Sequence, residues 1–129
     1  MIYDVKQKQF KLNDSSKNRY NDLLSLSDTE GKNPAETLNL IKEFVEYKTR
    51  DLTTTQLRNI WDEIKDVKTP GKLQLVRPRL AYIAGRNTKI RQLVEFFDVL
   101  ASDVTTKQQV ESYKTFIEAV VSYHKFYHD

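Results

Sequence analysis

Seven lysine and arginine side chains fall between Val67 and Val94, and no aspartate or glutamate falls among them. The net charge of the whole chain is only +3, so the residues outside this segment are acidic on balance. A local positive field of this kind attracts polyanions, and the phosphate backbone of a nucleic acid is a common target. The alternative is a solvated face whose cations pair with carboxylates from elsewhere in the fold. The seven cations are Lys68, Lys72, Arg77, Arg79, Arg86, Lys89 and Arg91.

These cations are threaded between apolar side chains. A helix anchored in a core by its apolar residues would present the cations on a rigid scaffold, and arginine adds a planar fork that binds phosphate oxygens in pairs. Within LVRPRLAYIAGRNTKIRQL, residues 75–93, the expected core positions are Leu75, Val76, Leu80, Ile83 and Leu93.

The sequence offers little for catalysis or metal binding. His124 and His128 have the i, i+4 spacing of zinc ligands on one helical face, but no glutamate follows His124 and no third ligand is evident. Neighbouring carboxylates such as Asp62 and Glu63 are expected by chance in a chain with 18 acidic residues. There is no glycine-rich phosphate loop, and nothing singles out a nucleophile. We therefore predict a non-enzymatic protein that uses no metal or other cofactor.

Length and composition limit the class of protein. A chain of 129 residues is expected to form one domain with a modest core, and its three glycines and three prolines are too few for a loop-rich all-β fold. The absence of cysteine excludes disulfides, thiolate catalysis and cysteine-ligated zinc. Because neither an N-terminal signal region nor a long apolar run is present, we expect a cytoplasmic protein with no membrane partner.

Hydrophobic periodicity is helical along most of the chain and predicts an all-α protein. We expect a compact bundle of about five helices over residues 33–129. Residues 1–32 form a polar N-terminal arm, whose composition is compatible with partial disorder and which holds at most one short helix near Tyr20. The arm and the bundle domain together account for the whole chain.

Capping signals mark several helix starts. Asn33 is the expected N-cap of the first helix, and Thr53 with Gln56 forms a capping box at the start of the second. The apolar stripe of the second helix includes Trp61, which we expect to anchor the core. Thr88 can start the fourth helix, and the last begins near residue 106 and ends in an aromatic cluster made of Tyr123, Phe126 and Tyr127.

Pro78 complicates the third helix. Residues 69–71, Thr-Pro-Gly, are expected to close the second helix, and Gly85 to end the third. Since proline removes one helical hydrogen bond, either a kinked helix runs over residues 72–84 or the regular part begins near Pro78. On a continuous helix one face holds Leu73, Val76, Leu80 and Ile83, while Leu75 and Tyr82 flank the cations.

Three blocks of sequence together resemble a known family. They are LTTTQLRNIWDEIK, LVRPRLAYIAGR and AVVSYHKFY, which occur in this order and reach from Leu52 to Tyr127. They resemble the small subunit of type III-A CRISPR effector complexes, the Csm complexes. That family's pattern has a T-T-x-Q/K-[LI]-R-N helix start, an L-R-P-[RK]-L-A-Y-x-A-G-R core and a terminal Y-H-K-F-Y. The central block is the most specific, and residues 1–32 have no counterpart in the pattern.

The resemblance implies a non-catalytic, all-helical RNA-binding subunit that acts in antiviral defence. In such complexes, copies of the small subunit stack head to tail as a filament beside the guide RNA and the target RNA paired with it. They hold both strands through the phosphate backbone. The implied partners are guide RNA and target RNA, the large subunit, the backbone subunit and further copies of the chain itself. RNA cleavage is the work of the backbone subunit, DNA cleavage and cyclic oligoadenylate synthesis are the work of the large subunit, and no small-molecule substrate is implied.

The RNA-binding residues come from two sources. By resemblance, the positions carried over are Arg58, Arg77, Arg79 and Arg86. The distribution of charge adds Lys65, Lys68, Lys72, Lys89 and Arg91. Phosphate contacts position a nucleic acid without reading its sequence, which suits a subunit whose guide changes. We expect Arg79 more than Arg77 to pair inside the fold instead, with a carboxylate such as Asp62 or Glu95.

Two other functions stay open at this point. A free-standing helical nucleic-acid-binding protein could use the same cations, although its sequence should also contain a recognition helix. A protein–protein adaptor would instead use the aromatic cluster at residues 123–127 as its contact surface.

Overall fold

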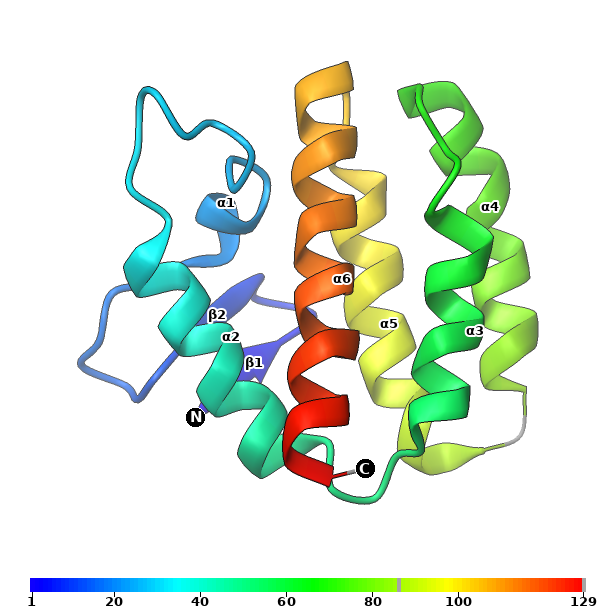
Figure 1. Cartoon of the computed structure of the whole chain (residues 1–129), viewed down its shortest axis with the longest axis horizontal. Coiled ribbons are helices and arrows are strands. Elements are labelled where there is room, and N and C mark those ends of the chain that lie inside the picture. The colour runs from blue at the N-terminus through cyan, green and yellow to red at the C-terminus, as the bar shows by residue number, and fades with distance from the viewer. Residues whose placement is uncertain (86, 129) are drawn as a thin grey trace.

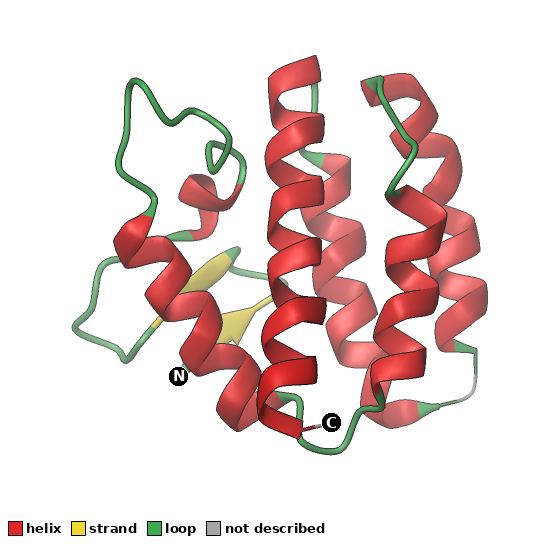
Figure 2. Ribbon diagram, viewed as in Figure 1, coloured by secondary structure: helices red, strands yellow, loops and turns green. Residues whose placement is uncertain are grey.

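The structure, a computed structural model, describes residues 1–85 and 87–128, and the predicted site residue Arg86 lies outside this described part. The all-α prediction is confirmed, because every regular element described is helical apart from one two-stranded hairpin (Figures 1 and 2). The elements are β1 (Ile2–Asp4), β2 (Gln9–Lys11), α1 (Tyr20–Leu23), α2 (Ala35–Lys48), α3 (Thr54–Ile64), α4 (Pro70–Ala84), α5 (Thr88–Ser102) and α6 (Lys107–His128). The five helices α2 to α6 are the five that the sequence predicts.

The long helix α6 is the central element of the bundle. It packs against α2 on one side and α3 on the other, and it also contacts α4 and α1 (Figure 1). Helix α5 lies behind α6, and α4 packs against both α3 and α5 at the edge of the molecule. One long face of α4 is therefore left without a covering element in the described chain.

The capping signals act locally as predicted, with a shift of one residue at α2. The Thr53 hydroxyl accepts a hydrogen bond from the Gln56 amide at 3.1 Å, and the Thr53 amide donates to Gln56 Oε1 at 2.9 Å, which confirms the capping box. At α2 the side chain of Asn33 accepts from the Ala35 amide at 3.0 Å, but the N-cap position itself is taken by Pro34.

Helix α4 begins earlier than expected and continues through Pro78. The Thr69 hydroxyl accepts from the Lys72 amide at 3.2 Å, so residues 69–71 open α4 rather than close α3, which already ends at Ile64. The expectation that these residues end the second helix is wrong because a threonine N-cap followed by proline in the first turn is also a strong helix start.

The first 32 residues fold onto the bundle. The rings of Tyr3 and Phe10 pack against Phe44 and Phe96, with centroids 5.2–5.7 Å apart. This differs from the partial disorder that the polar composition suggested, since a few apolar side chains among many polar ones are enough to attach the arm. The division of the chain at residue 32 stays a prediction. The buried apolar side chains of the arm are Phe10, Tyr20, Leu23 and Leu26.

The apolar face predicted for α4 is present, but one expected core position is wrong. Leu73 and Leu80 are buried, and Val76 and Ile83 are partly buried against the core. Leu75 is instead 71% exposed, because it lies outside the sector of α4 that faces α3 and α5. On α3, Trp61 packs against the core while remaining only partly buried, so it borders the core rather than anchoring its centre.

Candidate nucleic-acid interface

Five of the predicted cations are exposed and have no side-chain partner within the described chain. Three further ones, Lys65, Arg77 and Arg79, are held by carboxylates, and Arg86 lies outside the described residues. The structure thus separates cations with an internal role from cations available to a ligand. The five exposed cations without a side-chain partner in the described chain are Arg58, Lys68, Lys72, Lys89 and Arg91.

Arg77 is part of a polar network that joins α4 to α5. Its Nε donates to Asp98 Oδ1 at 2.8 Å and its Nη2 to Asp98 Oδ2 at 3.2 Å, while Nη1 donates to Gln74 Oε1 at 3.1 Å. The amide of Gln74 in turn donates to the Ala101 carbonyl at 2.9 Å. The hydrogen bond to Asp98 raises the pKa of Arg77, although burial opposes it. Arg77 is therefore engaged in holding the fold together.

Arg79 joins α4 to α3 in a more exposed place. Its Nε lies 2.9 Å from Glu63 Oε2, and its side chain remains 68% exposed. The expected partners were Asp62 or Glu95; Asp62 instead lies 3.3 Å from Lys65 along α3. The expected order of the two arginines is reversed, because Arg77 is the more enclosed one at about a third exposed. Arg79 keeps a guanidinium face open to a ligand.

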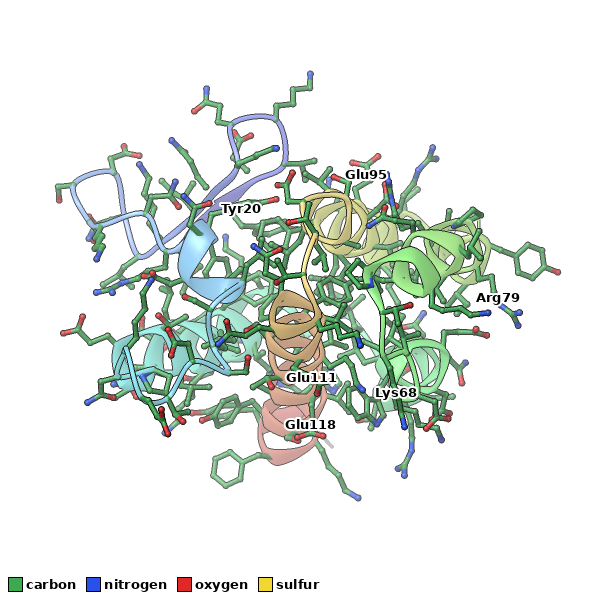
Figure 3. All side chains as sticks on the ribbon, turned by 90° about the horizontal axis from the view of Figure 1, so that it is seen from above. Tyr20, Lys68, Arg79, Glu95, Glu111 and Glu118 are labelled. Atoms are coloured by element: carbon green, nitrogen blue, oxygen red, sulfur yellow. The ribbon has the colours of Figure 1, made fainter. Side chains whose placement is uncertain are left out.

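Four of the five free cations form two groups, one at each end of α4, while the fifth, Arg58, lies on α3. Lys68 and Lys72 flank the N-terminus of α4, while Lys89 and Arg91 occupy the first turn of α5, which follows the C-terminus of α4. Arg79 lies between the two groups on the outer part of α4. Seen along the bundle, Lys68 and Arg79 lie on the α3–α4 side of the molecule, and Tyr20 lies on the other side (Figure 3).

Both groups stand where cations are electrostatically unfavourable for the helix. The N-terminus of a helix carries a partial positive charge, and acidic side chains in the first turn normally balance it. Neither α4 nor α5 has an acidic residue in its first turn, and lysine or arginine stands there instead. A bound anion would relieve this repulsion, and helix N-termini are common places for phosphate to bind.

The two histidines of α6 serve the fold. His124 is buried, with Nε2 2.9 Å from the Leu52 carbonyl oxygen and Nδ1 3.2 Å from Thr54 Oγ1. His128 Nε2 lies 3.0 Å from the Val45 carbonyl oxygen. The pair thereby attaches the end of α6 to the last part of α2, the start of α3 and the connection between them. Within residues 1–85 and 87–128, no three histidine or acidic side chains are grouped so that they could hold a metal ion.

Among the described helices, none combines the length and the apolar character needed to cross a bilayer.

The aromatic cluster near the end of α6 is divided between surface and core. Phe126 is 75% exposed with its ring centroid 5.0 Å from that of Tyr127, while Tyr123 packs partly against the core.

Comparison with known proteins identifies the family. The family model described as Csm2 Type III-A matches residues 31–129, which include α2 to α6 and every cation discussed above. The hairpin and α1 precede the matched region. No curated protein and no solved structure matches the chain. The chain belongs to the Csm2 family of type III-A CRISPR systems and is the small subunit of an effector complex that it forms with other Csm subunits.

Proposed function

We propose that this subunit is non-catalytic and binds guide RNA and target RNA through their phosphate backbones, without sequence specificity, in antiviral defence. Copies of the chain stack as a filament along the RNA. Two groups of free cations provide the binding surface, Lys68 with Lys72 and Lys89 with Arg91, together with Arg58. Arg79 contributes its open guanidinium face. Arg86 is included among the RNA-binding residues by its place in the family pattern alone.

The observation that carries this proposal is the placement of unpaired cations at the N-termini of α4 and α5. The described chain has a carboxylate to spare, since Glu118 projects from the exposed side of α6 (Figure 3). Cations left unpaired at helix N-termini cost the isolated protein stability, and an external polyanion offsets that cost. A phosphate backbone meets both groups at once because it presents charges at regular intervals.

This arrangement favours contact with the backbone over readout of bases. Three of the five partnerless cations are lysines, which are flexible point charges. Lys89 and Arg91 lie in the first turn of α5 rather than along a helix face that could enter a groove. A single copy makes few contacts and binds weakly. Aligned copies add their contacts, so affinity rises steeply once the chain is stacked within the complex.

The dependence of RNA affinity on salt tests the proposal. For single-stranded RNA, the log–log slope falls by about 0.7 for each phosphate contact removed. We expect Lys68→Gln with Lys72→Gln to make the slope shallower by about 1.4, and to weaken all RNA sequences alike. Lys42→Gln with Lys125→Gln is the matched control, because it makes the same charge change on the exposed surfaces of α2 and α6.

Equal effects of the two double variants would show that net charge alone drives binding and would contradict the proposed surface. Discrimination between RNA sequences by the Lys68 and Lys72 variants would also contradict it. For the non-catalytic role, purified chain incubated with RNA or DNA and Mg²⁺, Mn²⁺ or Zn²⁺ should leave the nucleic acid intact. Cleavage that a point substitution in this chain abolishes would overturn that role.

A further inference from the structure

Tyr82, on the uncovered face of α4, is the most exposed large apolar side chain in the described part of the protein, at 88%. Other exposed aromatics have partners. The Arg50 guanidinium lies 5.6 Å from the centroid of the Tyr47 ring, and Phe126 packs edge to face on Tyr127. Within the described residues, the ring of Tyr82 has no such neighbour. A single exposed apolar side chain is common on protein surfaces, but Tyr82 shares the uncovered face of α4 with Leu75, which is also exposed, and it is the company of this second apolar residue that points to a binding surface.

The side chains that share this face alternate between cationic and apolar. Lys72, Leu75, Arg79 and Tyr82 follow one another at intervals of three or four residues, so they lie within about 80° of the helix circumference over about 15 Å. Leu75 is 71% exposed, and Arg79 is fixed from the α3 side by Glu63. The face thus presents charge and apolar surface in turn, on a helix held rigidly by its neighbours.

The charge around Tyr82 indicates the chemistry of its partner. No acidic residue occurs between Val67 and Val94 in the sequence. Glu63 of α3 pairs with Arg79, but Lys72 on the same face has no ion-pair partner in the described chain, so this face still favours a partner that carries negative charge. A nucleotide combines a flat apolar face with an adjoining phosphate, which matches an exposed ring three residues from an arginine on the same helix face. A base inside a duplex has both faces covered by its neighbours, so along the length of an RNA the ring can stack only on an unpaired base.

We propose that Tyr82, on the same face of α4 as Leu75 two turns earlier, is a stacking platform for an unpaired base of the bound RNA. This inference rests on the proposed function and adds the class of nucleotide that the surface takes: single-stranded or flipped-out positions rather than only continuous duplex. Stacking requires no particular base, because every base has a π face. The platform is therefore compatible with a subunit that ignores sequence.

The test compares single-stranded RNA with the same sequence as duplex, using the full chain at low salt. Tyr82→Ala should weaken single-strand binding roughly ten-fold, the order expected for one stacked base, and change duplex binding less than about two-fold. Tyr82→Phe keeps the ring and should bind like the native chain. Phe126→Ala is the matched control, since it removes a similarly exposed ring outside the cationic segment and should change neither affinity.

A second readout reports the stack itself. An oligonucleotide carrying 2-aminopurine should lose fluorescence on binding the native chain, and this quenching should disappear with Tyr82→Ala. Because Tyr82 is exposed, its substitution should leave the helical circular dichroism spectrum unchanged, which separates loss of stacking from loss of fold.

The outcomes distinguish this proposal from the one on which it rests. If Tyr82→Ala binds single strands normally while Lys68→Gln with Lys72→Gln does not, stacking is overturned and backbone binding stands. If Tyr82→Phe binds as poorly as Tyr82→Ala, the hydroxyl and not the ring is responsible, and stacking is overturned. If Tyr82→Ala keeps RNA affinity but no longer purifies with the other Csm subunits, the ring contacts protein and the proposal is wrong. Should the native chain bind no RNA at all, both proposals fail.

Discussion

Arg77 and Asp98 form a two-pronged ion pair between α4 and α5, with Nε 2.8 Å from Oδ1 and Nη2 3.2 Å from Oδ2. Arg79, two residues later on α4, makes its ion pair with Glu63 of α3 instead. The two arginines thus fasten α4 to different neighbours, and they differ in how much of the side chain remains exposed. That difference separates an arginine of the fold from one that a ligand can still reach.

We expect Arg77→Met to lower the free energy of unfolding by about 1–3 kcal/mol, because Asp98 loses charged hydrogen bonds in a half-buried place. The salt slope of RNA binding should not change. Arg79→Met should cost less than about 1 kcal/mol, as exposed pairs do, and should make the slope shallower. Urea denaturation and binding titrations check both. If Arg77→Met instead made the salt slope shallower and left the stability nearly unchanged, Arg77 would belong to the RNA-binding surface.

Tyr20 should make the protein sensitive to alkaline pH. Its hydroxyl donates to Asp103 Oδ2 at 2.8 Å, and burial, with Asp103 beside it, raises the pKa of Tyr20 well above its usual value of 10.0. The unfolded chain releases this proton first, so the stabilisation is complete below about pH 10 and is lost as the pH rises further. The loss amounts to at most about 1.4 kcal/mol for each pH unit.

Tyr20→Phe should therefore cost about 1 kcal/mol near neutral pH, through the lost hydrogen bond, and should lose stability less steeply than the native chain between about pH 9 and pH 11. Burial also raises the pKa of Tyr113. Because Tyr113 is present in both proteins, it contributes equally to the pH dependence of their stability. Parallel pH profiles of the two proteins in urea denaturation would contradict this account of Tyr20.

The arm should unfold together with the bundle. Phe10 is enclosed by Phe44, Phe96 and Phe116, so Phe10→Ala should lower the free energy of unfolding by about 3–5 kcal/mol in a single transition. Leu12→Ala, two residues along and 44% exposed, is the matched control and should cost under about 1 kcal/mol. Two separate transitions in denaturation would show that the arm is an independent unit.

Trp61 should contribute less than its size suggests. Because its indole is only partly buried, Trp61→Ala should cost about 1.5–3 kcal/mol, below the roughly 3–5 kcal/mol expected for Phe96→Ala at a fully buried site. Urea denaturation of the two variants under the same conditions checks the order. A larger loss for Trp61 than for Phe96 would mean that α3 is rotated relative to the structure described above.

The helices were predictable because each carries local signals strong enough to act alone. The Thr53–Gln56 capping box and the period of the apolar residues on α3 and α6 need no knowledge of the rest of the chain. The start of α4 was missed because a Thr-Pro-Gly sequence can end one helix or begin the next. Which of these occurs depends on where α3 and α4 meet, and local sequence does not encode that meeting point.

The arm and the ion pairs could not be found in the same way. Phe10 and Tyr20 are isolated apolar residues whose burial depends on partners more than 70 residues away, such as Phe96 and Asp103. Charge along the sequence likewise locates a cationic segment but not the carboxylates that approach it in space. The unpaired cations therefore became distinguishable from the structural arginines only once α3, α4 and α5 were placed side by side.

The central position of α6 has a consequence for synthesis. Helices α2, α3 and α4 and the arm all bury apolar surface against a helix that the ribosome makes after every one of them. During translation these earlier segments can pack partly on one another and on α5, but the apolar surface that each buries against α6 stays exposed until α6 is made. Such exposed surface is the condition in which nascent chains aggregate or recruit chaperones. The bundle is therefore expected to close after residue 128 has emerged, in one late step, rather than helix by helix as the chain grows.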